Sequence, residues 1–253
     1  MSLQLPFTPL GVVFDVDETI LDNGHQTMGQ GYHEKFRLQA IHEIGKVHNI
    51  PALQSMTIEQ STLAFKTAFE HTFSASLWNM LCMAGVRSNP LEPDETDELH
   101  VQITQRKNEL YEQALHAAIQ PIHRAGELIE ATHALCDGKL AIASTARRVD
   151  IDIFLAVNGF DQYFLPERIF ALESLDNPKP DKESFTRGFM SLGIPEHESR
   201  RVIAFEDAPN GVASAKASGL YVIALTTHYS RQELSTGKYP ADMVIDSYDE
   251  LFT

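Results

Sequence analysis

The pattern of hydrophobic and polar residues changes character along the chain. Residues 10–15 (LGVVFD) form a short apolar run that ends in a charge, which is typical of a buried strand. From about residue 23 to residue 118 the apolar residues recur at helical spacing. Phe36, Ala40, Ile44 and Val47 fall on one predicted helical face. We therefore predict one strand followed directly by a long helical segment.

A second amphipathic helix is predicted near the end of that segment. Its apolar face comprises Leu99, Ile103, Leu110, Ala114 and Ala118. Pro93–Asp94 is the expected start of this helix, because proline and aspartate favour the first turn.

Beyond residue 121 the pattern alternates between short apolar runs and helical segments. The apolar runs lie at 139–143, 168–171, 201–205, 220–225 and 242–245, and the helical segments lie at 125–137, 147–158, 181–192 and 209–218. Such alternation is typical of a mostly parallel sheet covered by helices on both faces. We predict an α/β fold with a Rossmann-like parallel sheet core and an inserted helical cap domain. The core comprises residues 1–22 and 119–253 and the cap residues 23–118, with linkers near 22–31 and 118–123.

Composition narrows the possible partners and cellular location. The 253 residues carry a formal net charge of -15, which disfavours binding to the phosphate backbone of a nucleic acid. The longest apolar runs are far shorter than the ~20 residues needed to cross a bilayer. The N-terminus lacks the pattern of a signal peptide, and Cys82 and Cys136 are too few for a disulfide framework. We expect a reduced, cytoplasmic protein with no nucleic-acid or membrane partner.

Two carboxylates follow the first predicted strand. In the sequence FDVDETILD, Asp15 and Asp17 stand two positions apart, with Thr19 close behind. Neighbouring carboxylates can divide the chemistry between a nucleophile or metal ligand and a proton donor. The alternative is an ordinary turn or helix start, where Asp and Thr are common.

Hydroxyl and lysine side chains follow later strands. Ser144 and Thr145 come directly after the run at 139–143, where a hydroxyl beside the N–H groups of a helix start can bind phosphate. Ser144 alone could equally be an N-cap residue. Lys179 stands between Pro178 and Pro180, which hold the backbone extended and aim the side chain. A single loop lysine is otherwise usually solvated.

A second pair of acidic residues, Glu206 and Asp207, follows the run at 201–205. Hard cations such as Mg²⁺ prefer oxygen ligands of this type. Together with Asp15 and Asp17 these residues would crowd four carboxylates at one edge of a parallel sheet. Such crowding requires a cation, so we predict Mg²⁺ as the cofactor.

The order of these motifs resembles that of the haloacid dehalogenase-like (HAD) superfamily. Asp15 and Asp17 with Thr19 match its first motif, Ser144 the second, Lys179 the third, and Glu206 with Asp207 the fourth. The string from Phe205 to Gly219, the helical insert after the first motif and the sequence RKNELY at 106–111 look most like the beta-phosphoglucomutase-like and phosphoglycolate phosphatase-like branch. That branch usually has Gly where this chain has Glu18.

The resemblance implies a role for each motif residue. Asp15 would attack phosphorus and form an aspartyl-phosphate, and Asp17 would act as general acid and base. The phosphate-binding residues would be Thr19, Ser144, Thr145 and Lys179. Mg²⁺ would bind through Asp15, the backbone carbonyl of Asp17, and Asp207, with Glu206 as a ligand or close by.

The resemblance also implies an enzyme class, with alternatives. We expect a phosphoric monoester hydrolase acting on a small phosphorylated metabolite. A phosphomutase would need a second anion site, for which Arg147 is a candidate, and Lys107 is a candidate substrate contact in the cap. A dehalogenase is disfavoured because those enzymes lack a counterpart of Asp17. A non-catalytic binding module with the same fold is the remaining alternative.

Overall fold

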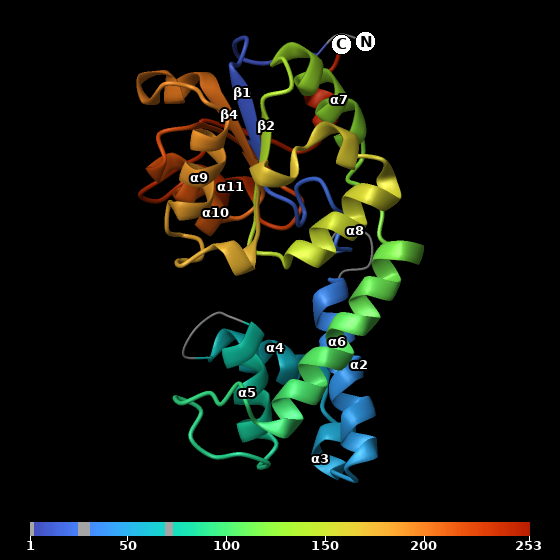
Figure 1. Cartoon of the computed structure of the whole chain (residues 1–253). Coiled ribbons are helices and arrows are strands. Elements are labelled where there is room, and N and C mark those ends of the chain that lie inside the picture. Colours follow the sequence, from blue (N-terminus) through green and yellow to red (C-terminus); the bar gives the residue numbers. More distant parts are fainter. Residues whose placement is uncertain (1–2, 25–30, 69–72) are drawn as a thin grey trace. The chain divides into compact units, whose positions relative to one another are not determined.

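The computed structural model describes residues 3–24, 31–68 and 73–253 (Figure 1). The described chain divides into two compact units. One unit, here called the α/β unit, comprises Met1–Thr27 and Leu115–Thr253, and the other, the helical unit, comprises Met28–Ala114. The helical unit is therefore an insertion in the sequence of the α/β unit.

A parallel sheet forms the centre of the α/β unit. Its strands, among the described residues, are β1 (Gly11–Phe14), β2 (Leu140–Ala143), β3 (Ile169–Phe170), β4 (Val202–Glu206), β5 (Tyr221–Leu225) and β6 (Met243–Ile245). They are ordered β3-β2-β1-β4-β5-β6, and every neighbouring pair is parallel. The strands β1, β2 and β4 are buried throughout, as their uninterrupted apolar sequences require. The predicted α/β fold is confirmed.

Helices cover both faces of this sheet. Figure 1 shows α7 (Ala125–Leu135) and α8 (Arg148–Asn158) on one side, and α9 (Glu183–Ser191), α10 (Pro209–Ala217) and α11 (Arg231–Ser235) on the other. Between α9 and the sheet a close approach requires Gly188, since a Cβ there would lie 2.9 Å from Val13. The connections include 3-10 helices η1 (Asp161–Tyr163), η2 (Pro166–Arg168), η3 (Leu172–Ser174), η4 (Glu196–Arg201) and η5 (Tyr248–Leu251).

The strand order fixes where a site can form. From β1 the chain proceeds to β2 and β3 on one side, and then returns to β4, β5 and β6 on the other side of β1. At such a switch point the connections leave in opposite directions, so a crevice opens at the carboxyl ends of the two central strands. Residues that directly follow β1 and β4 are therefore placed beside each other.

The helical unit contains α2 (Tyr32–Val47), α3 (Pro51–Gln54), α4 (Ile58–Lys66), α5 (Phe73–Met83) and most of α6 (Glu98–Ala117). Helix α2 packs on α3 and α4, and α4 packs on α5. Thr57 caps α4 by accepting a hydrogen bond from the Gln60 N–H at 3.3 Å. Its core is formed by fully buried side chains that include Ile41, Leu53 and Leu77.

Two details of the predicted helices are wrong. Helix α2 buries Phe36, Ala40 and Ile41, whereas Val47 is 75% exposed, so the buried face is rotated from the predicted one. The cause is tertiary packing against α3, which the helical spacing alone does not specify. Helix α6 begins at Glu98 rather than at Pro93–Asp94. The Asp97 side chain caps it by accepting hydrogen bonds from the N–H groups of Leu99 and His100.

The units divide at residues 27/28 and 114/115, whereas the sequence pattern places the boundaries at 22/23 and 118/119. Helix α6 runs without a break to Ala117, so no change of pattern marks the second boundary. The predicted linker at 22–31 includes residues 25–30, which lie outside the described residues. Within the described ranges, the structure contains no helix long and apolar enough to cross a membrane.

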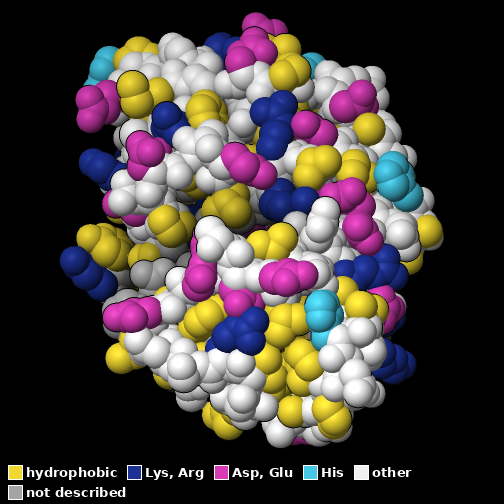
Figure 2. Space-filling view, turned by 60° about the horizontal axis from the view of Figure 1, so that its bottom comes forward, with side chains coloured by type: hydrophobic (Ala, Val, Ile, Leu, Met, Phe, Trp, Pro, Cys, Tyr) yellow, Lys and Arg dark blue, Asp and Glu magenta, His cyan; other side chains and the backbone are white. Residues whose placement is uncertain are grey.

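The sequence has an excess of acidic over basic residues. On the face drawn in Figure 2, basic side chains lie interspersed with acidic and hydrophobic ones. Acidic residues number 35 against 20 Lys and Arg in the sequence. An anionic ligand therefore needs a local cation to offset the field of the whole molecule.

Candidate active site

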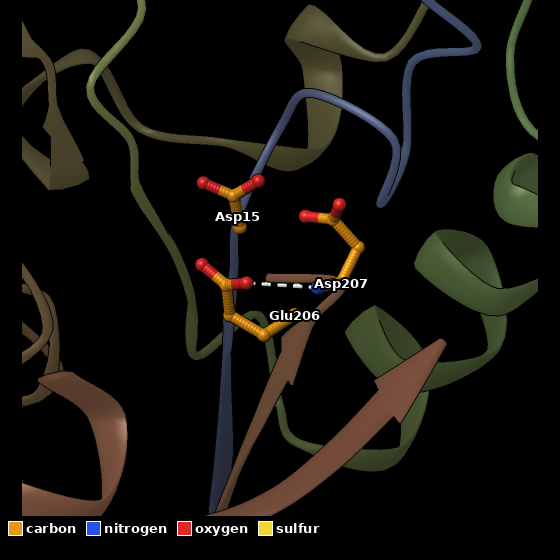
Figure 3. Close-up of side chains that lie close together, drawn as sticks. All are labelled: Asp15, Glu206 and Asp207. Atoms are coloured by element: carbon orange, nitrogen blue, oxygen red, sulfur yellow. Dashed lines mark hydrogen bonds between the residues drawn. The ribbon is translucent and has the colours of Figure 1, made fainter. Parts of the chain in front are cut away.

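Three buried carboxylates meet at the carboxyl ends of β1 and β4. Asp15 extends β1, and its N–H donates to the Phe205 carbonyl of β4 at 3.0 Å. Glu206 ends β4 and Asp207 follows it, so the three side chains come from adjacent strands and lie close together (Figure 3). Among the described residues they form the cluster whose carboxylate oxygens lie within 4.8 Å of one another. The switch point of the sheet thus brings together three of the predicted site residues, which come from two adjacent strands.

The Glu206 carboxylate is fixed by backbone donors at the start of α10. Its Oε2 atom accepts from the Asp207 N–H at 2.8 Å and from the Ala208 N–H at 2.7 Å. Gly211 leaves the space that this side chain occupies, since a Cβ there would lie 1.6 Å from Glu206 Oε1. Glycine at residue 211 is therefore a steric requirement of the carboxylate.

Lys179 is the cation of this cluster. Its Nζ atom lies 2.5 Å from Asp15 Oδ1 and 2.7 Å from Glu206 Oε1, and its side chain is 7% exposed. The loop that carries Lys179 is tied to α10, because Ser214 Oγ donates to the Asp181 carbonyl at 2.5 Å. Lys179 is therefore a buried, oriented lysine and not a solvated loop residue.

Burial and mutual repulsion control the charges of the cluster. Burial, together with the neighbouring Glu206 and Asp17, raises the pKa of Asp15 to about 7, although Lys179 opposes this shift. Burial also raises the pKa of Asp207 well above its ordinary value, and the charges of Glu206 and Asp15 add to this effect. For Lys179 burial alone would lower the pKa, but Asp15 and Glu206 outweigh it and raise the pKa. The lysine stays charged while two carboxylates resist ionisation.

The turn after Asp15 carries the second predicted carboxylate, Asp17. Residues Thr19, Ile20 and Leu21 all direct their N–H groups to the Val16 carbonyl, at 2.9 to 3.2 Å. Glu18 has φ of +55°, a left-handed conformation that glycine adopts more readily than other residues. The Asp17 side chain is half-buried and accepts from Asn23 Nδ2 at 3.4 Å.

Two hydroxyl side chains predicted to bind phosphate differ in their surroundings. Ser144 directly follows β2, the neighbour of β1, and is buried; its Oγ accepts from the Ala146 N–H at 3.1 Å. Thr19 is also buried, and its Oγ1 atom has no hydrogen-bond partner among the described residues. Thr145 is exposed. An orphan buried hydroxyl of this kind suits a ligand oxygen.

The two proposed substrate contacts lie outside the carboxylate cluster. Arg147 forms a bidentate ion pair with Asp150 in the first turn of α8, at 2.5 and 2.9 Å, and Asp150 is buried. Lys107 belongs to the helical unit, where it is 7% exposed and lies 5.0 Å from the Tyr111 ring centroid. Arg147 is thus already held by a carboxylate, and Lys107 is packed against an aromatic ring.

The donor set fits a hard divalent cation. Asp15, Glu206 and Asp207 offer only carboxylate oxygens, and two of them have raised pKa values that a bound cation would reverse. The Asp17 side chain is not a member of this cluster among the described residues. The role expected for its backbone carbonyl stays a prediction.

Sequence reasoning missed two hydroxyl groups near the turn. Thr227 Oγ1 donates to the Glu18 carbonyl at 2.6 Å, and Tyr248 OH donates to the Thr19 carbonyl at 2.9 Å. Thr227 follows the carboxyl end of β5 by two residues, a position that could have marked it. Tyr248 begins η5 and carries no such signal.

The chain matches a protein-family model described as haloacid dehalogenase-like hydrolase over residues 12–225. The chain belongs to this family. The match includes the sheet from β1 to β5 and every motif residue of the cluster, and it confirms the resemblance drawn from the motifs.

Individual relatives agree with this assignment. Glycerol-1-phosphate phosphohydrolase 1 of Saccharomyces cerevisiae is 27% identical over 165 residues, which are 63% of this chain and 62% of that protein. The crystal structure of a HAD hydrolase, family IA, variant 3 from Entamoeba histolytica has a TM-score of 0.70 at 19% identity and covers 96% of this chain and 95% of the other. A predicted phosphoglycolate phosphatase from Haemophilus somnus has a TM-score of 0.69 at 17% identity, with 97% of each chain covered.

The structural and the sequence similarities extend over different lengths of the chain. The two structures share the fold across nearly the whole chain, including the helical insertion, as the predicted branch requires. The chain spans less than two thirds of the length of the curated relatives it matches. The glycerol-1-phosphate phosphohydrolase activity is named for the yeast protein and is not thereby assigned to this chain.

Proposed function

We propose that this protein is a Mg²⁺-dependent phosphatase that hydrolyses a small phosphate monoester through an aspartyl-phosphate at Asp15. One observation carries the proposal: a buried lysine, Lys179, bridges Asp15 at 2.5 Å and Glu206 at 2.7 Å at the switch point of the sheet. An oriented cation beside a buried carboxylate is what attack on an anionic phosphate requires, because it offsets repulsion between nucleophile and substrate.

In the first half of the reaction Asp15 forms the new bond to phosphorus. The bond between phosphorus and the leaving oxygen breaks, its electron pair goes to that oxygen, and Asp17 donates a proton there. Lys179 stabilises charge on the phosphoryl oxygens, which Ser144 and Thr19 bind through their hydroxyl groups. The orphan Thr19 hydroxyl supports this assignment, since a phosphoryl oxygen would supply its partner. We assign Thr145, which is exposed, a peripheral phosphate contact.

In the second half water attacks the phosphorus of the aspartyl-phosphate. Asp17, now ionised, takes a proton from the water, and the bond between phosphorus and the Asp15 carboxylate oxygen breaks. Asp15 leaves as a carboxylate and inorganic phosphate is released. The same residue therefore serves as acid and then as base, which requires that its carboxylate be held at one place in both steps.

The cation would be held by the side chains of Asp15 and Asp207 and by the Asp17 carbonyl, with Glu206 beside them. When bound, it supplies electrostatic stabilisation of the phosphoryl group. The burial of these carboxylates and the raised pKa values of Asp15 and Asp207 support the assignment.

We further propose that the helical unit is a cap that supplies substrate-specific contacts and excludes water during the reaction. Lys107, buried in α6, is the candidate contact. The yeast relative's name suggests the first substrate to test, a glycerol phosphate.

Release of inorganic phosphate from a panel of phosphorylated polyols, sugars and glycolate, with Mg²⁺ present, tests the proposal. Mass spectrometry of rapidly quenched enzyme should detect a phosphorylated peptide containing Asp15, which the Asp15→Asn variant lacks. Wild-type enzyme that releases no phosphate from any member, or Asp15→Asn enzyme that keeps full activity, would reject the proposal.

A phosphomutase of the beta-phosphoglucomutase type would share the first half of this reaction. It must also hold a second phosphate, and the candidate Arg147 is occupied by Asp150 in a bidentate pair. We therefore expect free phosphate and no isomeric sugar phosphate. Phosphorus NMR of the reaction separates the two outcomes, since rapid isomer formation identifies a mutase.

A further inference from the structure

Two carbonyls of the turn after β1 are held by hydroxyl groups from distant parts of the sequence. The Glu18 carbonyl accepts from Thr227 Oγ1 at 2.6 Å, and the Thr19 carbonyl accepts from Tyr248 OH at 2.9 Å. All four residues are buried, with Tyr248 and Thr19 fully so. These bonds satisfy the two carbonyls, and a buried carbonyl left without a donor would destabilise the turn.

The turn needs such external support. Three of its internal hydrogen bonds converge on the Val16 carbonyl, a fourth runs from the Glu18 N–H to the Leu21 carbonyl at 2.7 Å, and Glu18 has φ of +55° without being glycine. A left-handed conformation is unfavourable for a non-glycine residue. The turn is therefore a strained conformation that its own bonds do not fully specify, and Asp17 lies within it.

The two donors are themselves rigid. Tyr248 packs edge-to-face on Phe205, with ring centroids 5.8 Å apart, and Phe205 stacks on Phe14 at 5.2 Å. Phe14 is the residue before Asp15. Thr227 lies just past β5, whose strand is buried beside β4. The turn is thus anchored to the same sheet that carries the nucleophile.

Tyr248 also stays a donor across the working pH range. Burial raises the pKa of its phenol well above the ordinary value, and the charges of Asp15 and Asp207 raise it further. The ring packs on Phe205, the residue before Glu206 of the cluster.

We propose that Thr227 and Tyr248 are positioning residues that fix the turn of residues 16–21 and thereby aim the Asp17 carboxylate at the leaving oxygen. The inference rests on the proposed phosphatase function. Proton transfer is sensitive to geometry, and a misplacement of about 1 Å can reduce a rate about 10²-fold. The two hydroxyls act through Asp17 and do not touch the substrate.

The nature of the leaving group separates positioning of Asp17 from general support of the fold. An alkyl phosphate needs a proton on its leaving oxygen, whereas p-nitrophenolate is a weak base that leaves without one. Loss of either hydroxyl should therefore slow transfer of the phosphoryl group to Asp15 from glycerol 1-phosphate and spare its transfer from p-nitrophenyl phosphate. The value of kcat/KM reports this first step, whereas kcat also includes the attack of water, for which Asp17 is the base with either substrate. A variant with a generally damaged site would lose both activities in equal measure.

The experiment compares Thr227→Val and Tyr248→Phe, which delete the hydroxyls, with Thr227→Ser, which keeps one. Thr226→Val is the matched control, because Thr226 bonds to the side chain of Asp246 at 2.8 Å at the exposed edge of the same segment. Steady-state kinetics with both substrates give kcat and KM for each variant, and circular dichroism and thermal melting monitor the fold.

We expect kcat/KM for glycerol 1-phosphate to fall at least about tenfold in both deletion variants. The kcat/KM for p-nitrophenyl phosphate should change less than about threefold, and Thr227→Ser and Thr226→Val should resemble wild type. Equal losses of kcat/KM with both substrates, or no loss, would overturn the inference. So would unfolding of both deletion variants when Thr227→Ser is native, because the hydroxyls would then serve folding alone.

Failure of the phosphatase proposal would look different. Wild-type enzyme would then release phosphate from neither substrate, or Asp15→Asn enzyme would remain active. With wild-type hydrolysis intact and Asp15→Asn inactive, any unfavourable result concerns only Thr227 and Tyr248.

Discussion

The two units of this protein bury polar side chains in different ways. In the α/β unit four buried charged side chains, Asp15, Lys179, Glu206 and Asp207, gather at one place, the carboxyl ends of β1 and β4. In the helical unit buried polar groups are dispersed and bonded locally, as for Arg37, whose Nε donates to Ser61 Oγ at 3.2 Å.

Strand direction explains the difference. All strands of the sheet are parallel, so polar residues that follow successive strands meet at the same edge. Helices that pack side by side share no such edge, and a polar residue between them needs its own nearby partner. Asn79, which donates to the Ala64 carbonyl at 2.9 Å, is an example. A concentrated set of charges indicates chemistry, whereas a dispersed set indicates local structure or substrate selection.

The sharpest test of this contrast is Asp15→Asn. The amide keeps the shape of the side chain but cannot attack phosphorus, so kcat should fall by about 10³-fold or more. The thermal midpoint should not fall, because the substitution removes a carboxylate that resists ionisation, with a pKa raised to about 7 by burial. Phosphate release and thermal melting measure the two effects.

Asp152→Asn is the matched control for that variant. Asp152 lies in α8 of the same unit and pairs with Arg148 at 2.8 Å on the surface. Its substitution should leave kcat within about twofold of wild type. Comparable losses in the two variants would mean that the buried cluster has no special role.

Removal of the cation or of its ligand is the next test. Chelation should abolish activity, and Asp207→Ala should raise the Mg²⁺ concentration for half-maximal activity by about tenfold or more. Protons compete with the cation for carboxylates whose pKa values are raised, so apparent Mg²⁺ affinity should weaken as pH falls below about 7. Activity titrated with Mg²⁺ at several pH values measures both effects. Full activity in excess EDTA would contradict the assignment.

Gly211→Ala tests the packing that holds Glu206. The new methyl would meet the Glu206 carboxylate, so either this side chain or α10 must move, at a cost of about 1–3 kcal/mol. We expect a lower thermal midpoint and a loss of activity of roughly tenfold, since the displaced carboxylate no longer anchors Lys179. Thermal melting and phosphate release are the measurements.

Gly126→Ala adds the same methyl to α7, where the nearest atom belongs to the Phe160 ring at 3.1 Å. The edge of the Phe160 ring can move aside, and alanine stabilises a helix by about 1 kcal/mol relative to glycine. Catalysis should therefore be unaffected. If Gly126→Ala impaired activity as much as Gly211→Ala, the effect could not be ascribed to Glu206.

The smallest effect is expected in the helical unit. Lys107→Met keeps the length of the side chain but removes its charge, and it should raise KM several-fold with kcat within about twofold. Arg37→Met is the control, since Arg37 is a similarly buried cation of the same unit whose Nε donates to Ser61 Oγ. It should alter the thermal midpoint and not KM. A large fall in kcat for either variant would break the contrast, because it would place chemistry in the helical unit.

Much of the fold and of the candidate site could be predicted because each signal is local. Asp15, Ser144 and Glu206 stand at or directly after buried apolar runs, so the parallel sheet places them at one edge. Two prolines flank Lys179, which marks it as an oriented side chain.

Other features could not be predicted because they depend on packing or on partners that the local sequence pattern does not specify. The buried face of α2 depends on its packing against α3 and α4. The Asp150 partner of Arg147 is an i,i+3 neighbour, but spacing alone does not distinguish such a pair from an anion site. Tyr248 and Thr227 reach the turn across more than 200 residues, and nothing in their own segments indicates a contact with it.

The strand order also affects how the protein folds during its synthesis. Residue 11 at the start of β1 pairs with residue 202 of β4, and Glu18 is held by a hydroxyl of residue 227. Such non-local pairing makes folding slow, because a long loop must close before the contacts stabilise it. During synthesis, β1 therefore stays unpaired on its β4 side, with its apolar residues exposed, until the residues of β4 (Val202–Glu206) have been made. We expect nascent chains that end before β4 to depend on chaperones, since their exposed strand edge is prone to aggregate.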